Sequence, residues 1–147
     1  MRITPADLAT LRAKRAGPAV SSWRDGVLTL VVPGALKNPL NARWYHYTRA
    51  RWSRTWHEKT AGAILEADQR QAWRAISALP RHVHFHAYVQ RLFDSDGLQA
   101  ALKPCRDALV VYGVLSDDSE RAGHEFTYEQ EKAALGWRGV VVTVTAR

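Results

Sequence analysis

The sequence predicts a single α+β domain in which a mixed β-sheet is flanked by helices. The chain has 147 residues, of which 46% are hydrophobic, so it is long enough to bury one core. Strand-like segments precede and follow helix-like segments. They lack the steady strand–helix–strand rhythm of a parallel α/β sheet, which favours the α+β class. We expect residues 1–20 to form an N-terminal helical extension and residues 21–147 to form the domain.

The first expected elements are a short basic helix and a strand. Thr4 is a suitable cap, with Pro5 at the first helical position, for a helix that continues to about Arg15. Gly26 to Val32 has the composition of a strand, which Pro33 ends.

A long polar and aromatic connection, Lys37 to Lys59, leads from this strand to the longest expected helix. That helix spans Thr60 to Leu79, and Pro80 closes it. Helical spacing predicts a buried stripe that consists of Ala61, Ile64, Leu65, Ala72, Ile76 and Leu79.

The second half of the chain is expected to hold three strands and one further helix. His82 to Leu92 alternates as a strand, with Val83, Phe85, Ala87 and Val89 on one side. Leu98 to Val111 is a helix whose apolar face consists of Leu98, Ala101, Leu102, Cys105, Ala108 and Leu109. Pro104 removes one helical hydrogen bond, so either the helix kinks there or its regular part begins there. The last strands are His124 to Gln130 and Val140 to Thr145.

Acidic side chains stand on both sides of this helix, and its polar face carries a lysine. The residues are Asp94, Asp96, Lys103, Asp107, Asp117 and Asp118. Asp94 and Asp96 are two positions apart, so in an extended segment they point to the same side and can share an ion. Asp107 follows Lys103 by four positions, which favours a salt bridge that orients the lysine. Taken one by one, such aspartates are often helix caps or solvated turn residues.

The segment Phe93 to Asp118 resembles the signature of the RusA-like Holliday junction resolvases, many of them encoded by phages and prophages. That signature is an Asp-x-Asp-Asn pair, a helix with a lysine and an aspartate, a Gly-hydrophobic turn and Asp-Asp. The LKPxxDxL form of the helix and Gly113 match it, whereas Gly97 replaces the asparagine and Lys103 lies about one turn later than in the shortest members. The resemblance is weaker over Lys37 to Ala63 and Arg138 to Arg147.

The resemblance implies that residues 21–147 form a RusA-like nuclease domain. It implies that Asp94, Asp96 and Asp118 are catalytic carboxylates that bind Mg²⁺, with Mn²⁺ as a substitute. Lys103 would stabilise charge on the scissile phosphate or orient the water. Asp107 and Asp117 would support the site from behind these ligands. A homodimer is implied as well.

The connection Lys37 to Lys59 combines cationic and aromatic residues. Its candidate DNA-binding residues are Lys37, Asn41, Arg43, Arg49, Arg51 and Arg54, interleaved with Trp44, Tyr45, Tyr47, Trp52 and Trp56. Arginines contact phosphate and flat rings stack on exposed bases, and the net charge of +7 favours a polyanionic partner. Alternatively, the tryptophans are core residues or a dimer seam and the arginines are merely solvated.

Histidines at alternate positions of one strand offer a second, weaker metal pattern. His82, His84 and His86 have a spacing that can hold zinc, although no cysteine or further histidine is placed to complete a set. By strand parity they can also line the approach to Asp94. The single cysteine, Cys105, excludes an internal disulfide and is expected to be a buried thiol.

These observations together predict a Mg²⁺-dependent endodeoxyribonuclease that resolves four-way DNA junctions by symmetric paired nicks. The alternatives are a noncatalytic branched-DNA-binding protein, to which Gly97 points, and a nucleotide phosphohydrolase, which the basic charge disfavours. The longest apolar run, Val27 to Leu36, is too short to span a bilayer, so no membrane partner is expected. We expect the protein in the bacterial host cytoplasm, associated with the nucleoid.

Overall fold

The computed structural model describes residues 4–6, 20–40, 46–68, 73, 79–133 and 136–147. The elements, in chain order, are β1 (Ser22–Arg24), β2 (Val27–Pro33), α2 (His46–Ala67), β3 (Arg81–Val89), α3 (Ser95–Val111), the 3-10 turn η2 (Glu120–Ala122), β4 (Glu125–Lys132) and β5 (Gly139–Ala146). The helix predicted from Thr4 to Arg15 lies outside the described residues except for 4–6.

One five-stranded sheet organises the described chain, in the order β1-β2-β5-β3-β4. β3 and β4 are parallel, and the other neighbouring strands are antiparallel. A parallel pair needs a long crossover, and α3 with the loop after it supplies the connection between β3 and β4. The sheet is therefore mixed, and the predicted α+β class is confirmed.

A tight hairpin that the sequence analysis did not predict opens the sheet. Asp25 and Gly26 both have positive φ, 52° and 76°, which is the backbone conformation of the two central residues of a type I′ turn. β1 therefore pairs with β2 directly. The predicted strand was placed one residue too early, because Gly26 belongs to the turn.

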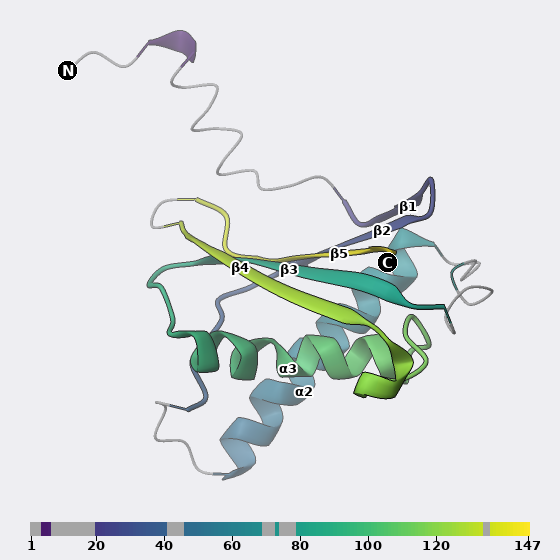
Figure 1. Ribbon diagram of the computed structural model, residues 1–147. Coiled ribbons are helices and arrows are strands. Elements are labelled where there is room, and N and C mark those ends of the chain that lie inside the picture. Colours follow the sequence, from purple (N-terminus) through teal and green to yellow (C-terminus); the bar gives the residue numbers. More distant parts are fainter. Residues whose placement is uncertain (1–3, 7–19, 41–45, 69–72, 74–78, 134–135) are drawn as a thin grey trace.

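The helices α2 and α3 lie on the same side of the sheet, as Figure 1 shows. β3 alternates between buried and partly exposed residues, so Val83, Phe85, Ala87 and Val89 enter the core as predicted. The core is completed from the helices and the other strands, chiefly by Leu28, Leu30, Trp56, Ile64, Trp73, Leu102, Leu109, Val142 and Val144. The strand residues between these core positions point to the opposite face of the sheet. Among the described elements, no helix covers that face.

The helix α2 begins earlier than predicted, and its buried stripe is different. The segment expected to be an irregular connection up to Lys59 is helical from His46. The core-facing residues are Trp56, Thr60, Ala63 and Ile64, with the i, i+4, i+7, i+8 spacing of one helix face. Ala61 is also buried.

The predicted stripe was wrong at two positions. Leu65 is exposed, because the core face of α2 follows Trp56, Thr60 and Ile64. Leu79 is also exposed and lies beyond the end of the helix. α2 ends at Ala67, and Ala72 and Ile76 lie outside the described residues.

The helix α3 runs through Pro104 without interruption and buries the face that was predicted. The proline is itself buried, along with Leu98, Ala101, Leu102, Cys105, Ala108 and Leu109. Burial raises the pKa of the Cys105 thiol to about 11, so this cysteine is an inert core residue as expected. No helix among the described residues has the length and apolar character needed to cross a membrane.

Candidate functional site

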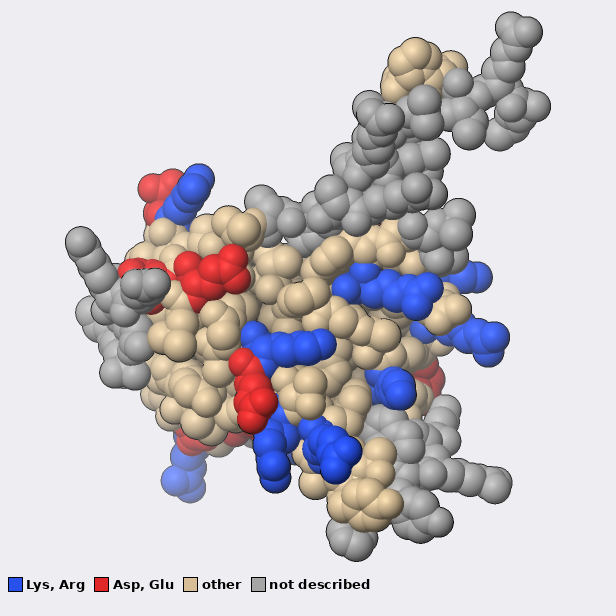
Figure 2. Space-filling view, turned by 180° about the vertical axis from the view of Figure 1, so that it is seen from behind, with Lys and Arg blue, Asp and Glu red and all other residues tan. Residues whose placement is uncertain are grey.

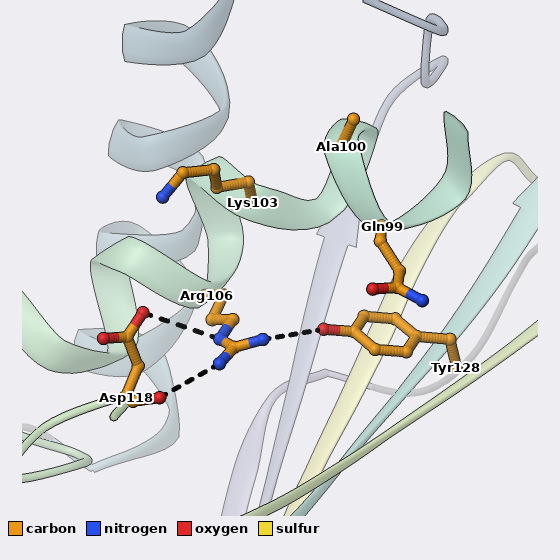
Figure 3. A pocket seen from close by; sticks show the side chains of 6 residues that line it. All are labelled: Gln99, Ala100, Lys103, Arg106, Asp118 and Tyr128. Atoms are coloured by element: carbon orange, nitrogen blue, oxygen red, sulfur yellow. Dashed lines mark hydrogen bonds and ion pairs between the residues drawn. The ribbon is translucent and has the colours of Figure 1, made fainter. Parts of the chain in front are cut away.

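An open pocket of about 370 Å³ lies beside the exposed face of α3 (Figure 3). Its lining residues are Gln99, Ala100, Lys103, Arg106, Asp118 and Tyr128. α3 supplies the first four, at spacings that keep them on one side of the helix. The loop after α3 supplies Asp118, and β4 supplies Tyr128 from the helix-facing side of the sheet. The pocket thus combines two cations, one carboxylate and a phenol.

Arg106 is the central residue of this pocket, and the sequence analysis did not identify it. Its Nη2 donates to the backbone oxygen of Asp118 at 3.1 Å, and its Nη1 donates to the Tyr128 hydroxyl at 3.2 Å. Its Nε lies 3.6 Å from Oδ2 of Asp118, an ion-pair distance too long for a hydrogen bond. The guanidinium also stacks 3.6 Å above the Phe126 ring. The available signal was its spacing of three from Lys103 on one helix face.

The two aspartates after α3 take different roles. Asp118 turns to the pocket and pairs with Arg106, and its side chain remains 40% exposed. Asp117 accepts hydrogen bonds from the hydroxyl and the backbone N–H of Ser119, at 2.7 and 3.1 Å. These bonds hold the pKa of Asp117 below its ordinary value. Asp117 is therefore a turn residue and does not line the pocket.

The predicted pair between Lys103 and Asp107 is confirmed. Lys103 Nζ lies 3.1 and 3.2 Å from the two carboxylate oxygens of Asp107, one turn further along α3. The lysine side chain is 68% exposed, so the pair is a surface salt bridge. Lys103 is also one of the residues that line the pocket (Figure 3).

The first acidic pair stands at the start of α3. Asp94 is the N-cap: its Oδ1 accepts from the backbone N–H of Gly97 at 3.0 Å, the ordinary capping bond of an aspartate. Asp96 is exposed in the first turn, where an acid is favoured by the helix dipole, and it makes no hydrogen bond or ion pair within the described chain.

Two side chains hold the backbone around this cap. Gln130 of β4 accepts from the N–H of Phe93 at 2.9 Å and donates to its carbonyl at 2.7 Å, so both amide atoms are used. On the other side, the Asn38 amide fills the space next to Gly97: a Cβ added there would overlap its Nδ2 and lie 2.8 Å from its Cγ. Gly97 stands where the RusA-like signature has an asparagine, and in this chain Gln130 holds Phe93 before the cap while Asn38 packs against Gly97.

Asp94, Asp96 and Asp118 do not form one compact ligand group. Among the described residues, the single set of three metal-ligating side chains with ligand atoms within 4.8 Å of one another is His84, His86 and Glu129. These histidines have the parity opposite to the core residues of β3, so they lie on the sheet face away from α3 and do not line its pocket.

The predicted DNA-binding arginines are on α2. Arg49, Arg51 and Arg54 are all exposed on its first turns, and Lys37 lies in the segment before the helix. Asn41 and Arg43 lie outside the described residues, as do Trp44 and Tyr45. Figure 2, the view from behind, shows lysine and arginine side chains gathered over the side of the molecule where α2 lies.

The aromatic residues of this segment divide between core and surface. Trp56 is buried and Trp52 packs partly buried against the core, so the interpretation as core residues is confirmed for them. Tyr47 is 58% exposed beside the arginines. Among the aromatic residues of this segment that the structure describes, it is the exposed one.

Comparison with known proteins identifies no relative of this chain. No protein-family model matches the chain. No curated protein is significantly similar to it.

Proposed function

We propose that the protein binds branched DNA and cuts it as a metal-dependent endodeoxyribonuclease of the junction-resolvase type. The observation that carries the proposal is the α3 pocket, which is lined by Lys103, by Arg106 and by the Asp118 carboxylate that pairs with Arg106. Lysine and arginine bind phosphate oxygens, and carboxylates hold hard cations. A site that offers both suits a phosphodiester.

The α2 helix supplies the surface for the remaining DNA. Its exposed arginines at 49, 51 and 54 add sequence-independent phosphate contacts, and the net charge of +7 attracts a polyanion. A four-way junction has two equivalent cleavage positions, so a two-fold homodimer with one site per subunit is the assembly that cuts strands symmetrically.

The donor types fit a hard cation such as Mg²⁺, with Mn²⁺ as a substitute, because all three carboxylates offer oxygen ligands. The arrangement of the three carboxylates in the single chain does not fit a metal site, because they do not form one compact ligand group. Asp94 uses one oxygen in the helix cap, and Asp118 is paired with Arg106. A bound ion would lower the pKa of a water and neutralise charge on the phosphate.

These same two contacts favour a second candidate, a noncatalytic protein that binds branched DNA. A capping aspartate and an ion-paired aspartate are both explained without a metal. In that case the pocket holds a backbone phosphate through Lys103 and Arg106 and no bond is cut.

A cleavage assay separates the two candidates. Purified protein is incubated with a synthetic four-way junction, with Mg²⁺ and with a chelator, and with the variants Asp96→Asn and Asp118→Asn. Cleavage that requires Mg²⁺ and is lost in both variants, while junction binding survives, supports the nuclease. Asp25→Asn is the matched control and should retain most activity, because Asp25 is exposed in the β1–β2 hairpin, does not line the pocket, and has a positive φ that asparagine also accepts. Binding without cleavage under every condition identifies the noncatalytic protein.

A further inference from the structure

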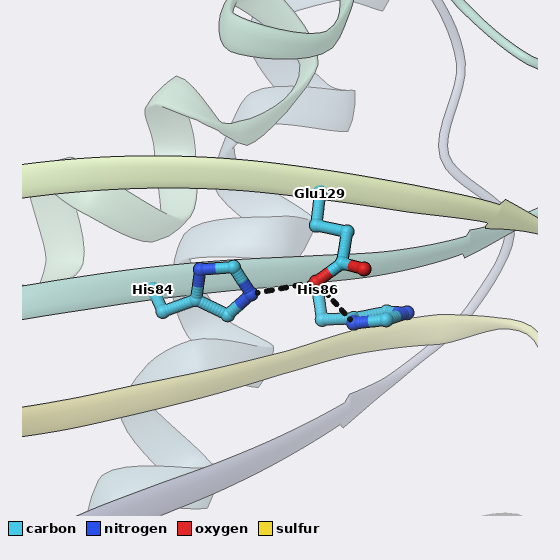
Figure 4. A group of neighbouring side chains, drawn as sticks. All are labelled: His84, His86 and Glu129. Atoms are coloured by element: carbon cyan, nitrogen blue, oxygen red, sulfur yellow. Dashed lines mark hydrogen bonds and ion pairs between the residues drawn. The ribbon is translucent and has the colours of Figure 1, made fainter.

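The open face of the sheet carries a row of imidazoles on β3 beside threonine and glutamate side chains on β4. The parallel register aligns His84 with Thr127 and His86 with Glu129, so acids on the edge strand meet histidines on its neighbour. Figure 4 shows the two rings and the Glu129 carboxylate pointing toward one another. One ligand atom from each of the three lies within 4.8 Å of the others.

We propose that His84, His86 and Glu129 form a binding site for a divalent transition metal, with Zn²⁺ the first candidate. The Glu129 Oε2 atom lies 3.2 Å from Nε2 of His84 and 3.3 Å from Nδ1 of His86. Ligand atoms about 2.0–2.1 Å from a tetrahedral ion are separated from one another by about 3.3 Å. Two edges of the coordination polyhedron are therefore already at the required length.

The ring nitrogens that face away from Glu129 also have the partners that a metal site requires. Nδ1 of His84 lies 2.7 Å from the Thr127 hydroxyl, and Nε2 of His86 lies 2.9 Å from the Glu131 carboxylate. Metal-bound histidines usually donate their second N–H to a carboxylate, a carbonyl or another acceptor, which fixes the tautomer and the ring orientation. Both imidazoles are thus oriented by the fold before any ion arrives.

The ligand chemistry selects against the hard cation proposed for α3. Two imidazoles and one carboxylate suit Zn²⁺, Ni²⁺ or Cu²⁺, whereas Mg²⁺ prefers an all-oxygen shell. Three protein ligands leave at least one coordination position for water or another ligand. The imidazoles are 32% and 21% exposed, so an ion can reach them from solvent while the surrounding sheet restrains their motion.

The ion would join the edge strand β4 to β3. β4 is bonded to the sheet on one side only, and its opposite face carries Tyr128 and Gln130, which contact Arg106 and Phe93. Because an ion that binds the folded chain more tightly than the unfolded one stabilises it, occupancy should raise the melting temperature.

The test titrates the full-length protein with Zn²⁺ against a chromophoric chelator, in excess Mg²⁺ so that the aspartates of α3 cannot contribute. We expect one Zn²⁺ per chain, a higher melting temperature and, with Co²⁺ in place of Zn²⁺, the visible absorption of a tetrahedral ion. His84→Ala and the isosteric Glu129→Gln should weaken binding by about 100-fold or more, and Glu131→Gln by about 10- to 100-fold. Circular dichroism verifies that each variant is folded.

His57→Ala is the matched control, because it removes an imidazole of α2, which lies on the other side of the sheet from the ligand set. It should change the affinity by no more than about threefold, well below the loss expected for a ligand. Wild-type protein that takes no Zn²⁺ from the chelator overturns the proposal. Affinity that is unchanged by Glu129→Gln, or is lost equally in His57→Ala, overturns the assigned ligand set.

Discussion

Arg106 contacts Asp118 twice: its Nη2 donates a hydrogen bond to the backbone oxygen at 3.1 Å, and its Nε forms an ion pair with the carboxylate at 3.6 Å. The same guanidinium reaches the Tyr128 hydroxyl on β4 and covers the Phe126 ring. One side chain of α3 therefore positions the loop after the helix and the edge strand together. A residue with this role fixes the geometry of the pocket whether or not the pocket catalyses a reaction.

The first prediction concerns this arginine. Arg106→Lys keeps the charge but cannot make the planar contacts to Asp118 and Tyr128 at once, so it should lower the free energy of unfolding by about 1–2 kcal/mol. Urea denaturation measures the change. Arg121→Lys, at an exposed position on η2, is the control and should be neutral within about 0.5 kcal/mol. Equal effects of the two substitutions would show that Arg106 is an ordinary surface arginine.

Gln130 provides a sharper test of how the start of α3 is held. Gln130→Glu keeps an acceptor for the N–H of Phe93 but loses the donor to its carbonyl and sets a carboxylate against that oxygen. We expect a loss of about 1–3 kcal/mol in unfolding free energy, because the Phe93 carbonyl loses its partner. Gln99→Glu, on the exposed face of α3, should cost much less. If Gln130→Glu costs no more than Gln99→Glu, the two hydrogen bonds between Gln130 and Phe93 do not stabilise the start of α3.

Asn38 and Gly97 should be energetically coupled. In the wild-type chain, Gly97→Ala sets a Cβ against Asn38 and against the capping oxygen of Asp94, so the gain in helix propensity is lost. Asn38→Ala removes the overlapping amide. A double-mutant cycle measured by chemical denaturation should therefore give a favourable coupling of about 0.5 kcal/mol or more. Simple additivity of the two substitutions would mean that the amide does not occupy this space.

His124 predicts a decrease in stability at mildly acidic pH. Burial, and secondly the charge of Arg81, hold the pKa of His124 below its ordinary value of 6.5. Its Nδ1 accepts from the backbone N–H of Arg81 at 3.0 Å, which requires that nitrogen to be unprotonated. The unfolded chain therefore binds the proton more readily than the folded chain. Titration of His124 does not affect the free energy of unfolding well above pH 6.5. As the pH falls from 6.5 toward the lower pKa of the folded state, it decreases that free energy progressively.

The measurement is the free energy of unfolding across this pH range in wild type and in His124→Gln. The variant should have a shallower pH dependence, and His57→Gln, on α2, serves as the control for histidine titration elsewhere. Parallel curves for wild type and His124→Gln would exclude His124 as the source.

Local patterns in the sequence were enough to predict α3 and β3. An apolar face repeated over about three turns determines which side of α3 is buried, and strict alternation does the same for β3. The start of α2 was missed because its first turns, around Arg49 and Arg51, are exposed on all sides and carry no stripe. The hairpin was missed although Asp25-Gly26 is a strong turn signal.

The site residues that the sequence did not reveal depend on contacts between distant segments. Glu129 meets His84 and His86 only because β3 and β4 are parallel and in this register, which no local spacing encodes. Arg106 becomes central because Tyr128 and Asp118 converge on it from β4 and from a loop. Conversely, the shared-ion interpretation of Asp94 and Asp96 assumed an extended segment, whereas Asp96 is already in the first turn of α3.

The last prediction tests the DNA surface proposed for α2. Binding of a four-way junction should weaken steeply as salt rises, because each phosphate neutralised by a cation releases a condensed counterion. Replacing Arg49, Arg51 and Arg54 together by alanine should reduce the slope of log affinity against log salt by about 2 to 3 units, at about 0.9 per lost phosphate contact. The matched control replaces three exposed arginines elsewhere, Arg24, Arg91 and Arg121, and should leave the slope nearly unchanged. Fluorescence anisotropy over a salt series measures both, and equal slopes for the two triple variants would mean that junction DNA does not lie along α2.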